Sequence, residues 1–468
     1  MDLARCIAAE MRFQDHALSR ELSEWQTRTM EEPAFKVHRS QIVRICRALD
    51  SARQELGMDA LSGDEVDDRD ALFRNLNRQR QHLHALHTLW NFFRHKLLQR
   101  MQTSFQTFLL FADDLAWACY GPCLAEMRGQ AEGLREPPLT FLSMEPAPFA
   151  QSRRSSFLPP GLSALERKLL YASLRRMPVP VIGLPWLHIG HFPDLILVGH
   201  ETAHVVADDL ALEQEFAPLI AGIGEIPEDR RAHWRAWLDE VFADIFGFLV
   251  GGAGFGFGLV RALAGDAGVI LAEKADPKGA YPPRRVRMAV ARATAEHLGL
   301  DTAFAATWEN EYGPVSAPHA PDIEPLVAAV LAHPFTRVGG KTLAQLLAPP
   351  ATERVDAYLD MLIDESSPSG LLDIRAATSA AAIAHARKPE IWDNQDADDS
   401  GPRARLIDHF LRSRDDGYRD EDRRSVKLRH LDERDADLYS ARMRHEDHDI
   451  GQNIAALFAA ETTEKNPT

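Results

Sequence analysis

The stretch from Leu195 to Val206 constrains the chain most, because metal-binding residue types interrupt an apolar run. His200 and His204 are four residues apart, and Glu201 directly follows the first histidine. On an α-helix, residues four apart lie on one face, one turn from each other. The flanking residues are mostly Leu, Ile and Val, and Pro193-Asp194 supplies a helix-start signal. The stretch therefore predicts an apolar helix that presents two imidazoles on one face.

Two imidazoles in this arrangement can close on one metal ion, and Glu201 would lie beside it as a general base for water. The pattern also arises by chance, and a lone histidine on an apolar helix is more often a satisfied core residue. However, each buried polar group without a partner costs about 1–3 kcal/mol. A shared role at a metal ion therefore explains His200, Glu201 and His204 better than three separate burials.

A second pair of acidic residues points to the same site. Glu240 and Asp244 are four residues apart in a helix predicted to begin near Glu228, and their neighbours are mostly aromatic or aliphatic. Buried carboxylates need a partner or a metal. With Glu240 as a third ligand, the site has two His, one Glu and an open fourth position, which is the pattern of catalytic zinc. Asp244 could accept the N–H of a ligating histidine and fix its tautomer.

Charge and cysteine content exclude several classes of protein. The net charge of −16 argues against a nucleic-acid-binding surface, because phosphate contacts need clustered Lys and Arg. Four cysteines in 468 residues do not make a disulfide framework. The longest run free of charged residues and histidine, 245–260, is shorter than the ~20 apolar residues of a membrane span, and the N-terminus has no export signature. We expect a soluble, cytoplasmic protein with no membrane span and no nucleic-acid partner.

Changes in composition predict three regions. Residues 1–135 show apolar positions at three- and four-residue spacing, which predicts an N-terminal helical domain without chemistry of its own. Within it, Asp113 and Asp114 are better explained by a cap or a buried salt bridge than by function. Residues 136–386 would form the metal-binding domain and its following helices. Residues 387–468 are charged and poor in apolar residues, which predicts a weakly helical or disordered tail.

The start of the second region predicts a small β element. Residues 136–162 are rich in Pro and Ser, which is typical of a domain boundary or a long surface loop, and a helix is predicted over 165–176. Residues 178–185 are short, β-branched and bounded by Pro, which favours an edge strand to which an extended peptide could add. The expected fold is mainly α, α+β at most, with a small edge β element.

Three further motifs suggest nucleotides but lack the required context. Leu187-His-Ile-Gly-His191 spells the ATP-binding signature of class I aminoacyl-tRNA synthetases, yet neither the second signature loop nor alternating strands and helices follow it. The glycines between 251 and 258 follow a helix and lack the dinucleotide-binding spacing. Gly339-Gly-Lys-Thr342 lacks the first glycine of a phosphate loop. We therefore predict no nucleotide site from these motifs.

Three motifs in order resemble those of the gluzincin metallopeptidases, and of their CAAX-protease-type group in particular. They are His200-Glu-x-x-His204, Glu240-x-x-Ala-Asp244 and Tyr281-Pro-Pro-x-x-x-Arg287, within Leu195–Leu298. The resemblance implies a zincin-like helical core and a zinc-dependent endopeptidase. It assigns His200, His204 and Glu240 as ligands, Glu201 as base and Asp244 behind the site. Tyr281 stands where the family usually has His, and many family members are embedded in membranes.

The expected reaction is hydrolysis of a peptide bond in a peptide or protein substrate, with Zn²⁺ as cofactor. Glu201 would take the proton of the attacking water, and His233, Tyr281 and Arg287 are candidates to stabilise the oxyanion. The alternative is a non-catalytic helical interaction module with a structural or degenerate metal site, although structural zinc usually has four protein ligands. If the N-terminal helices cover the cleft, removal of residues 1–135 should raise activity.

Overall fold

The chain is mainly helical with one small mixed sheet, as a computed structural model shows, and this confirms the predicted fold class. The structure describes residues 3–57, 69–127, 136–151, 172–174, 176–276, 279–314, 319–364, 373–393, 401–415 and 433–463. The helices are α1 (Leu3–Glu31), α2 (Pro33–Lys36), α3 (Arg39–Glu55), α4 (Arg69–Leu98), α5 (Thr103–Met127), α7 (Val198–Asp209), α8 (Glu213–Gly222), α9 (Glu228–Leu263), α10 (Ala267–Ala272), α11 (Arg284–His297), α12 (Ala303–Tyr312), α13 (Ala320–Ala332), α14 (Leu343–Leu346), α15 (Thr352–Ile363), α16 (Ile374–Arg387), α17 (Glu390–Asp393), α18 (Pro402–Asp415) and α20 (Glu433–Thr463). Short 3₁₀ segments are η2 (Gln99–Met101), η3 (Trp186–His188), η4 (Phe192–Leu197) and η5 (Thr336–Val338).

The sheet has the strand order β1-β3-β2, with β1 (Leu139–Ser143), β2 (Phe149–Gln151) and β3 (Val181–Pro185). The predicted strand exists as β3, but it is central rather than at an edge, since it pairs in parallel with β1 and antiparallel with β2. Pro178 and Pro180 lie before the strand and Pro185 ends it, so these prolines leave its middle free to pair on both sides. A peptide cannot add to β3. The other two strands come from the segment predicted to be a loop.

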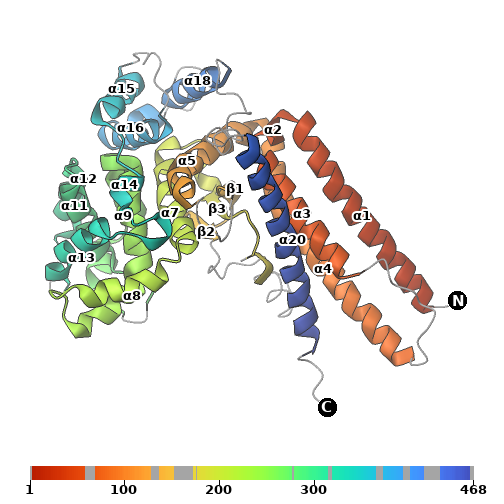
Figure 1. Cartoon of the computed structure of the whole chain (residues 1–468). Helices are drawn as coiled ribbons and strands as arrows, with labels where there is room; N and C mark the ends of the chain where they lie inside the picture. The colour runs from red at the N-terminus through yellow and green to blue at the C-terminus, as the bar shows by residue number, and fades with distance from the viewer. Residues whose placement is uncertain are drawn as a thin grey trace.

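The helices pack into two neighbouring hydrophobic cores (Figure 1). The first core joins α5, α7, α9, α13 and α16. The second core joins α1, α3, α4 and α20 to the sheet residues Leu139, Phe141 and Val181. Figure 1 shows the second group as a bundle of long helices that extends away from α9, α11 and α13. Because α5 belongs to the core of α7, the two cores divide between α4 and α5.

The C-terminal region, predicted to be a solvated tail, contains the long helix α20, which packs along α3. Ile454 and Phe458 are buried in the second core, and Gly451 lets the helices approach, because a Cβ there would lie 2.4 Å from that of Ser51. This helix was hard to predict from the sequence, because only a narrow stripe of its residues is apolar and most of the others are charged or polar. Residues 394–400, 416–432 and 464–468 of the predicted tail, and most of the predicted helix 165–176, lie outside the described residues.

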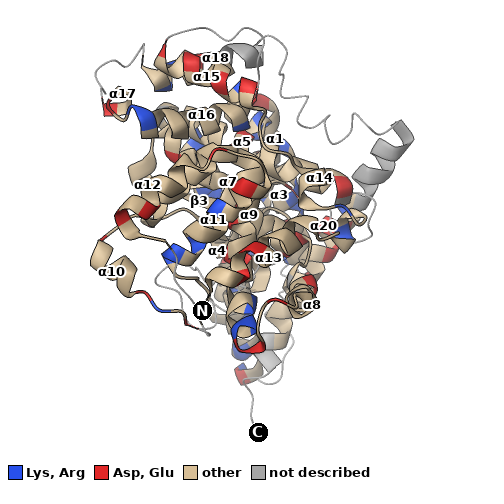
Figure 2. Ribbon diagram, turned by 90° about the vertical axis from the view of Figure 1, so that its left-hand side faces the viewer, with Lys and Arg blue, Asp and Glu red and all other residues tan. Residues whose placement is uncertain are grey.

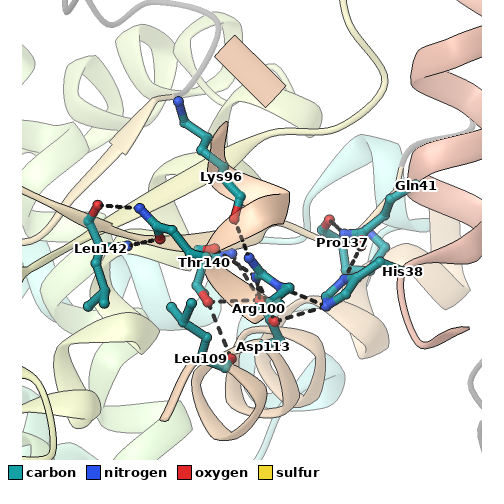
Figure 3. Close-up of polar contacts among 10 residues, drawn as sticks. His38, Gln41, Lys96, Arg100, Leu109, Asp113, Pro137, Thr140 and Leu142 are labelled. Carbon is teal, nitrogen blue, oxygen red and sulfur yellow. Dashed lines mark hydrogen bonds and ion pairs between the residues drawn. The ribbon is translucent and has the colours of Figure 1, made fainter. Parts of the chain in front are cut away.

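A buried polar network ties the second core to the sheet (Figure 3). Arg100 donates from Nη2 to both oxygens of Asp113, at 3.0 and 2.8 Å, and His38 lies 3.3 Å from the same carboxylate. Thr140 of β1 donates its backbone N–H and its hydroxyl to Asp113. Burial raises the pKa of Asp113, but Arg100 and His38 outweigh burial and hold it below its usual value. The interpretation of Asp113 as a buried salt bridge is therefore confirmed.

Two helices are long and apolar enough to cross a membrane by length and composition alone. They comprise residues Phe105–Glu126 and Glu228–Leu263, and 61% and 83% of their apolar windows are buried inside the fold. Burial of this extent is typical of core helices.

Figure 2 shows basic and acidic residues intermixed over the helices on the side that carries α10 to α13.

Candidate metal centre

The site forms where α7 crosses α9, and small residues allow the close crossing. A Cβ on Gly199 of α7 would lie 2.9 Å from Cγ1 of Val250 on α9, and one on Gly251 would lie 2.4 Å from Ile196. Only glycine fits at such contacts. Gly252 has a φ of 54°, so α9 is interrupted there, after the turns that carry Glu240 and Asp244. The glycines after residue 247 thus serve helix packing.

Three side chains from the two helices converge with their ligand atoms facing one another. His200, His204 and Glu240 offer one atom each, all within 4.8 Å of one another. The two Nε2 atoms are 3.3 Å apart, and the Glu240 oxygens lie 3.5 Å from His200 Nε2 and 3.6 Å from His204 Nε2. Two imidazole nitrogens this close need a proton or a cation between them, because their lone pairs repel. The predicted triad is therefore assembled and can hold a metal.

A carboxylate stands behind each imidazole. Asp244 Oδ1 lies 3.0 Å from His200 Nδ1, and Asp239 Oδ2 lies 3.5 Å from His204 Nδ1. Outer carboxylates of this kind hold the ligand ring in place and fix the proton on Nδ1, so that Nε2 is free to bind. The sequence indicated Asp244 but missed Asp239. Asp239 could have been found from the sequence, because it is an acidic residue directly before the predicted ligand Glu240, on the same turn of the helix.

Arg287 joins the ligands to this outer layer. It donates from Nε and Nη2 to Asp244, at 2.8 and 2.7 Å, and its Nη1 lies 3.4 Å from Oε2 of Glu240. The sequence offered Arg287 as a stabiliser of the oxyanion. The structure instead commits its guanidinium to two carboxylates, which is the role of a positioning residue. Asp244 could attract it because a buried carboxylate needs a cationic partner.

The electrostatics of the site favour positive charge at its centre. Burial lowers the pKa of His200, but Asp244 and Glu240 outweigh burial and raise it to about 10. Burial also lowers the pKa of His204, but a hydrogen bond with Asp239 raises it, and the net effect is a pKa above the usual value. The carboxyl of Glu240 has a lowered pKa, because His200 and Arg287 overcome the effect of burial. A proton or a metal cation satisfies the same demand.

Glu201 and Tyr281 lie close enough to the triad to act on it electrostatically. Glu201 is buried, and its charge raises the pKa values of His204, Tyr281 and Arg287. Tyr281 is 69% exposed, yet the charge of Glu240, followed by partial burial and Glu201, raises the pKa of its phenol. The charges of Glu201 and the triad therefore act on one another and on the Tyr281 phenol.

His233 is not among the residues that the structure brings to the triad. It precedes Glu240 by seven residues on α9, about 10 Å along the helix axis. Its Nδ1 lies 3.1 Å from Nε2 of His319, and its ring stacks on Trp237 with centroids 5.2 Å apart. His233 thus lies about two helical turns from Glu240, and its described contacts are with His319 and Trp237.

The comparisons with known proteins add nothing to this geometry. No protein-family model matches the chain, and searches of curated proteins and of solved structures found no match. Across the described part of the chain, His200, His204 and Glu240 form the one group of three or more metal-binding side chains with this spacing. The resemblance to the gluzincins rests on these residues and their neighbours.

Proposed function

We propose that the protein is a zinc-dependent metallopeptidase of the gluzincin type, with His200, His204 and Glu240 as the ligands. The convergence of these three ligand atoms, buried and backed by carboxylates, carries the proposal. Two imidazoles and one carboxylate suit zinc, and three protein ligands leave a fourth position open for water. Structural zinc sites are normally closed by four protein ligands, so the donor set favours an enzyme over an interaction module.

The residues divide the chemistry among them. His200, His204 and Glu240 would hold the zinc, which would supply Lewis acidity and lower the pKa of water to about 7. Glu201 takes the proton from the attacking water on its carboxylate and later returns it to the leaving amine. Asp244 and Asp239 hold the Nδ1 protons of the two imidazoles, and Arg287 fixes Asp244. The phenol of Tyr281 donates a hydrogen bond to the oxyanion as it forms.

The small sheet offers a place for an extended substrate. Among the described strands, β2 pairs on one side only, and it packs against α7, the helix that carries His200 and Glu201. A peptide that adds to a sheet edge is held by backbone hydrogen bonds, which suits a peptidase. We propose a peptide or protein substrate in extended conformation beside α7.

Digestion of an unstructured protein tests this function. Full-length protein loaded with zinc is incubated with casein, in parallel with Glu201→Gln and with Glu311→Gln as a matched control on the exposed face of α12. The wild type and the control should cleave casein, whereas Glu201→Gln should retain its zinc and lose activity by at least about 100-fold. A zinc-loaded wild type that never cleaves would favour the interaction module, and a fully active Glu201→Gln protein would remove Glu201 from the mechanism.

A further inference from the structure

His188 and His191, which lie in the segment where we predict no nucleotide site, both approach the half-buried carboxylate of Asp194. His191 Nδ1 lies 2.6 Å and His188 Nδ1 lies 3.8 Å from Oδ2 of Asp194. Arg261, near the end of α9, donates from Nη2 to the other oxygen of Asp194 at 2.8 Å. Asp194 thus organises two imidazoles and one guanidinium around itself, at the start of the segment that leads into α7.

The helices α16, α17 and α18 complete this arrangement. The ring of His385 meets that of His191 edge to face at 4.9 Å, and Trp392 lies 6.2 Å from the same ring. Arg403 packs over Gly190, where φ is +78° and a Cβ would lie 2.9 Å from its Nη1. We call the following residues the His191 cluster: His188, His191, Asp194, Arg261, His385 and Trp392.

Three nitrogen atoms of the His191 cluster are buried and have no hydrogen-bond partner among the residues that the structure describes. They are Nη1 of Arg261, Nδ1 of His385 and Nε1 of Trp392. Buried polar atoms are nearly always paired with protein, water or ligand, so three unpaired nitrogens within one cluster require an explanation. The side chains of His191 and Arg261 are 31% and 25% exposed, which lets a solute reach the cluster.

The formal charges around His385 balance, and unpaired N–H donors remain beside them. The guanidinium groups of Arg261 and Arg403 are matched by the carboxylates of Asp194 and Asp393. Burial, followed by the positive charge of Arg261, lowers the pKa of His385 to about 4, and burial also lowers that of His188. Both imidazoles are therefore neutral near pH 7 and can donate N–H groups. Unpaired N–H donors beside a guanidinium are what an anion needs for charge-assisted hydrogen bonds.

We propose that the His191 cluster binds a tetrahedral oxyanion of the phosphate type, with Arg261 as its charged partner and His385 and Trp392 as hydrogen-bond donors. The donors come from α9, α16 and α17, so they approach from different directions. An anion with four acceptor oxygens meets such a set better than a planar carboxylate does. A metal ion is a poorer fit, because Arg261 repels a cation and the described ligand atoms here lack the spacing found at the triad.

Isothermal titration of the full-length protein with inorganic phosphate, at constant ionic strength against chloride, tests this proposal. His385→Phe keeps a ring against His191 and removes the nitrogen, while the Arg261–Asp194 pair stays intact. His385→Phe and Arg261→Met should each weaken phosphate binding at least tenfold, and Arg292→Met, on the exposed face of α11, should leave it unchanged. If Arg261→Met fails to fold, His385→Phe decides alone.

Four results would overturn the proposal. One is a heat of phosphate binding no larger than that of chloride, and another is equal binding by the wild type and His385→Phe. Loss of binding in His200→Ala, with His385→Phe unaffected, would place the anion at the triad instead. Sulfate should compete with phosphate, whereas acetate that bound as tightly as phosphate would contradict a tetrahedral ligand.

Discussion

Nδ1 of His200 lies 3.0 Å from Oδ1 of Asp244, and two hydrogen bonds from Arg287 hold that carboxylate in place. The pair links the turn of α7 that carries His200 and His204 to α9 and, through Arg287, to α11. A ligating imidazole that is fixed in this way loses little freedom when it binds an ion. The outer layer of the site is therefore as specific a feature of the fold as the triad itself.

This relationship predicts a loss of zinc affinity when the outer charge is removed. Asp244→Asn keeps the shape of the side chain and should weaken zinc binding by about 10- to 100-fold, because partners behind ligands contribute to that extent. Asp239→Asn is the matched control. Its side chain is 56% exposed, against 1% for Asp244, so water screens it and the effect should be smaller. Competition with a chelator of known affinity measures both, and equal losses would contradict the account.

The packing of α5 predicts the fate of an N-terminal deletion. Phe111 of α5 meets Phe192 with ring centroids 4.8 Å apart, and Tyr120 donates to Asp209 at the end of α7 at 2.5 Å. Removal of residues 1–135 takes away α5 and exposes this core, so the product should be unfolded or aggregated rather than activated. Circular dichroism and size-exclusion chromatography test this. A soluble truncation with a native melting transition and raised activity would restore the idea of a covering domain.

The contact between α20 and α3 predicts a pH dependence of stability. Asp447 lies 2.8 Å from Nε of Arg44, but burial outweighs this partner and raises the pKa of Asp447 to about 6. The folded state therefore binds the proton more tightly than the unfolded state, where the pKa is near 3.9. The stabilisation from protonation is fully present below about pH 4 and is lost as the pH rises through about 6.

Asp447→Asn removes this titration. Between pH 5 and pH 7 the free energy of unfolding of the wild type should fall by about 1 kcal/mol relative to that of the variant. Denaturant unfolding of both proteins at the two pH values measures the difference. A relative gain for the wild type at pH 7 would have the wrong sign and would show that Asp447 is held as a carboxylate.

The sequence predicted the triad well because metal chemistry requires particular residue types at helical spacing. His200, His204 and Glu240 can be recognised by residue type and spacing alone, without knowledge of how the rest of the chain packs. Asp239 and His233 show the limit of such reasoning. Both lie on α9 near Glu240, and which of them reaches the site depends on how α7 crosses α9, a relationship that small residues such as Gly199 establish only in the folded protein.

Elements that depend on distant partners were harder to predict. β3 reads as an edge strand from its flanking prolines, but its place in the centre depends on β1 and β2, which come from a Pro-rich segment. The helix α20 carries so many charges that its few buried residues, such as Phe458, gave little signal. Its stability comes from α3, roughly 400 residues earlier in the chain.

Zinc titration of the wild type and of Glu240→Gln tests the central claim most directly, with Glu225→Gln as an exposed control. The account predicts one zinc ion per chain in the wild type and in the control. Glu240→Gln should bind at least about 100-fold more weakly, because a neutral amide is a poor ligand for zinc. X-ray absorption of the wild-type complex should show two imidazole ligands. Zinc binding that is unchanged in Glu240→Gln would contradict the account.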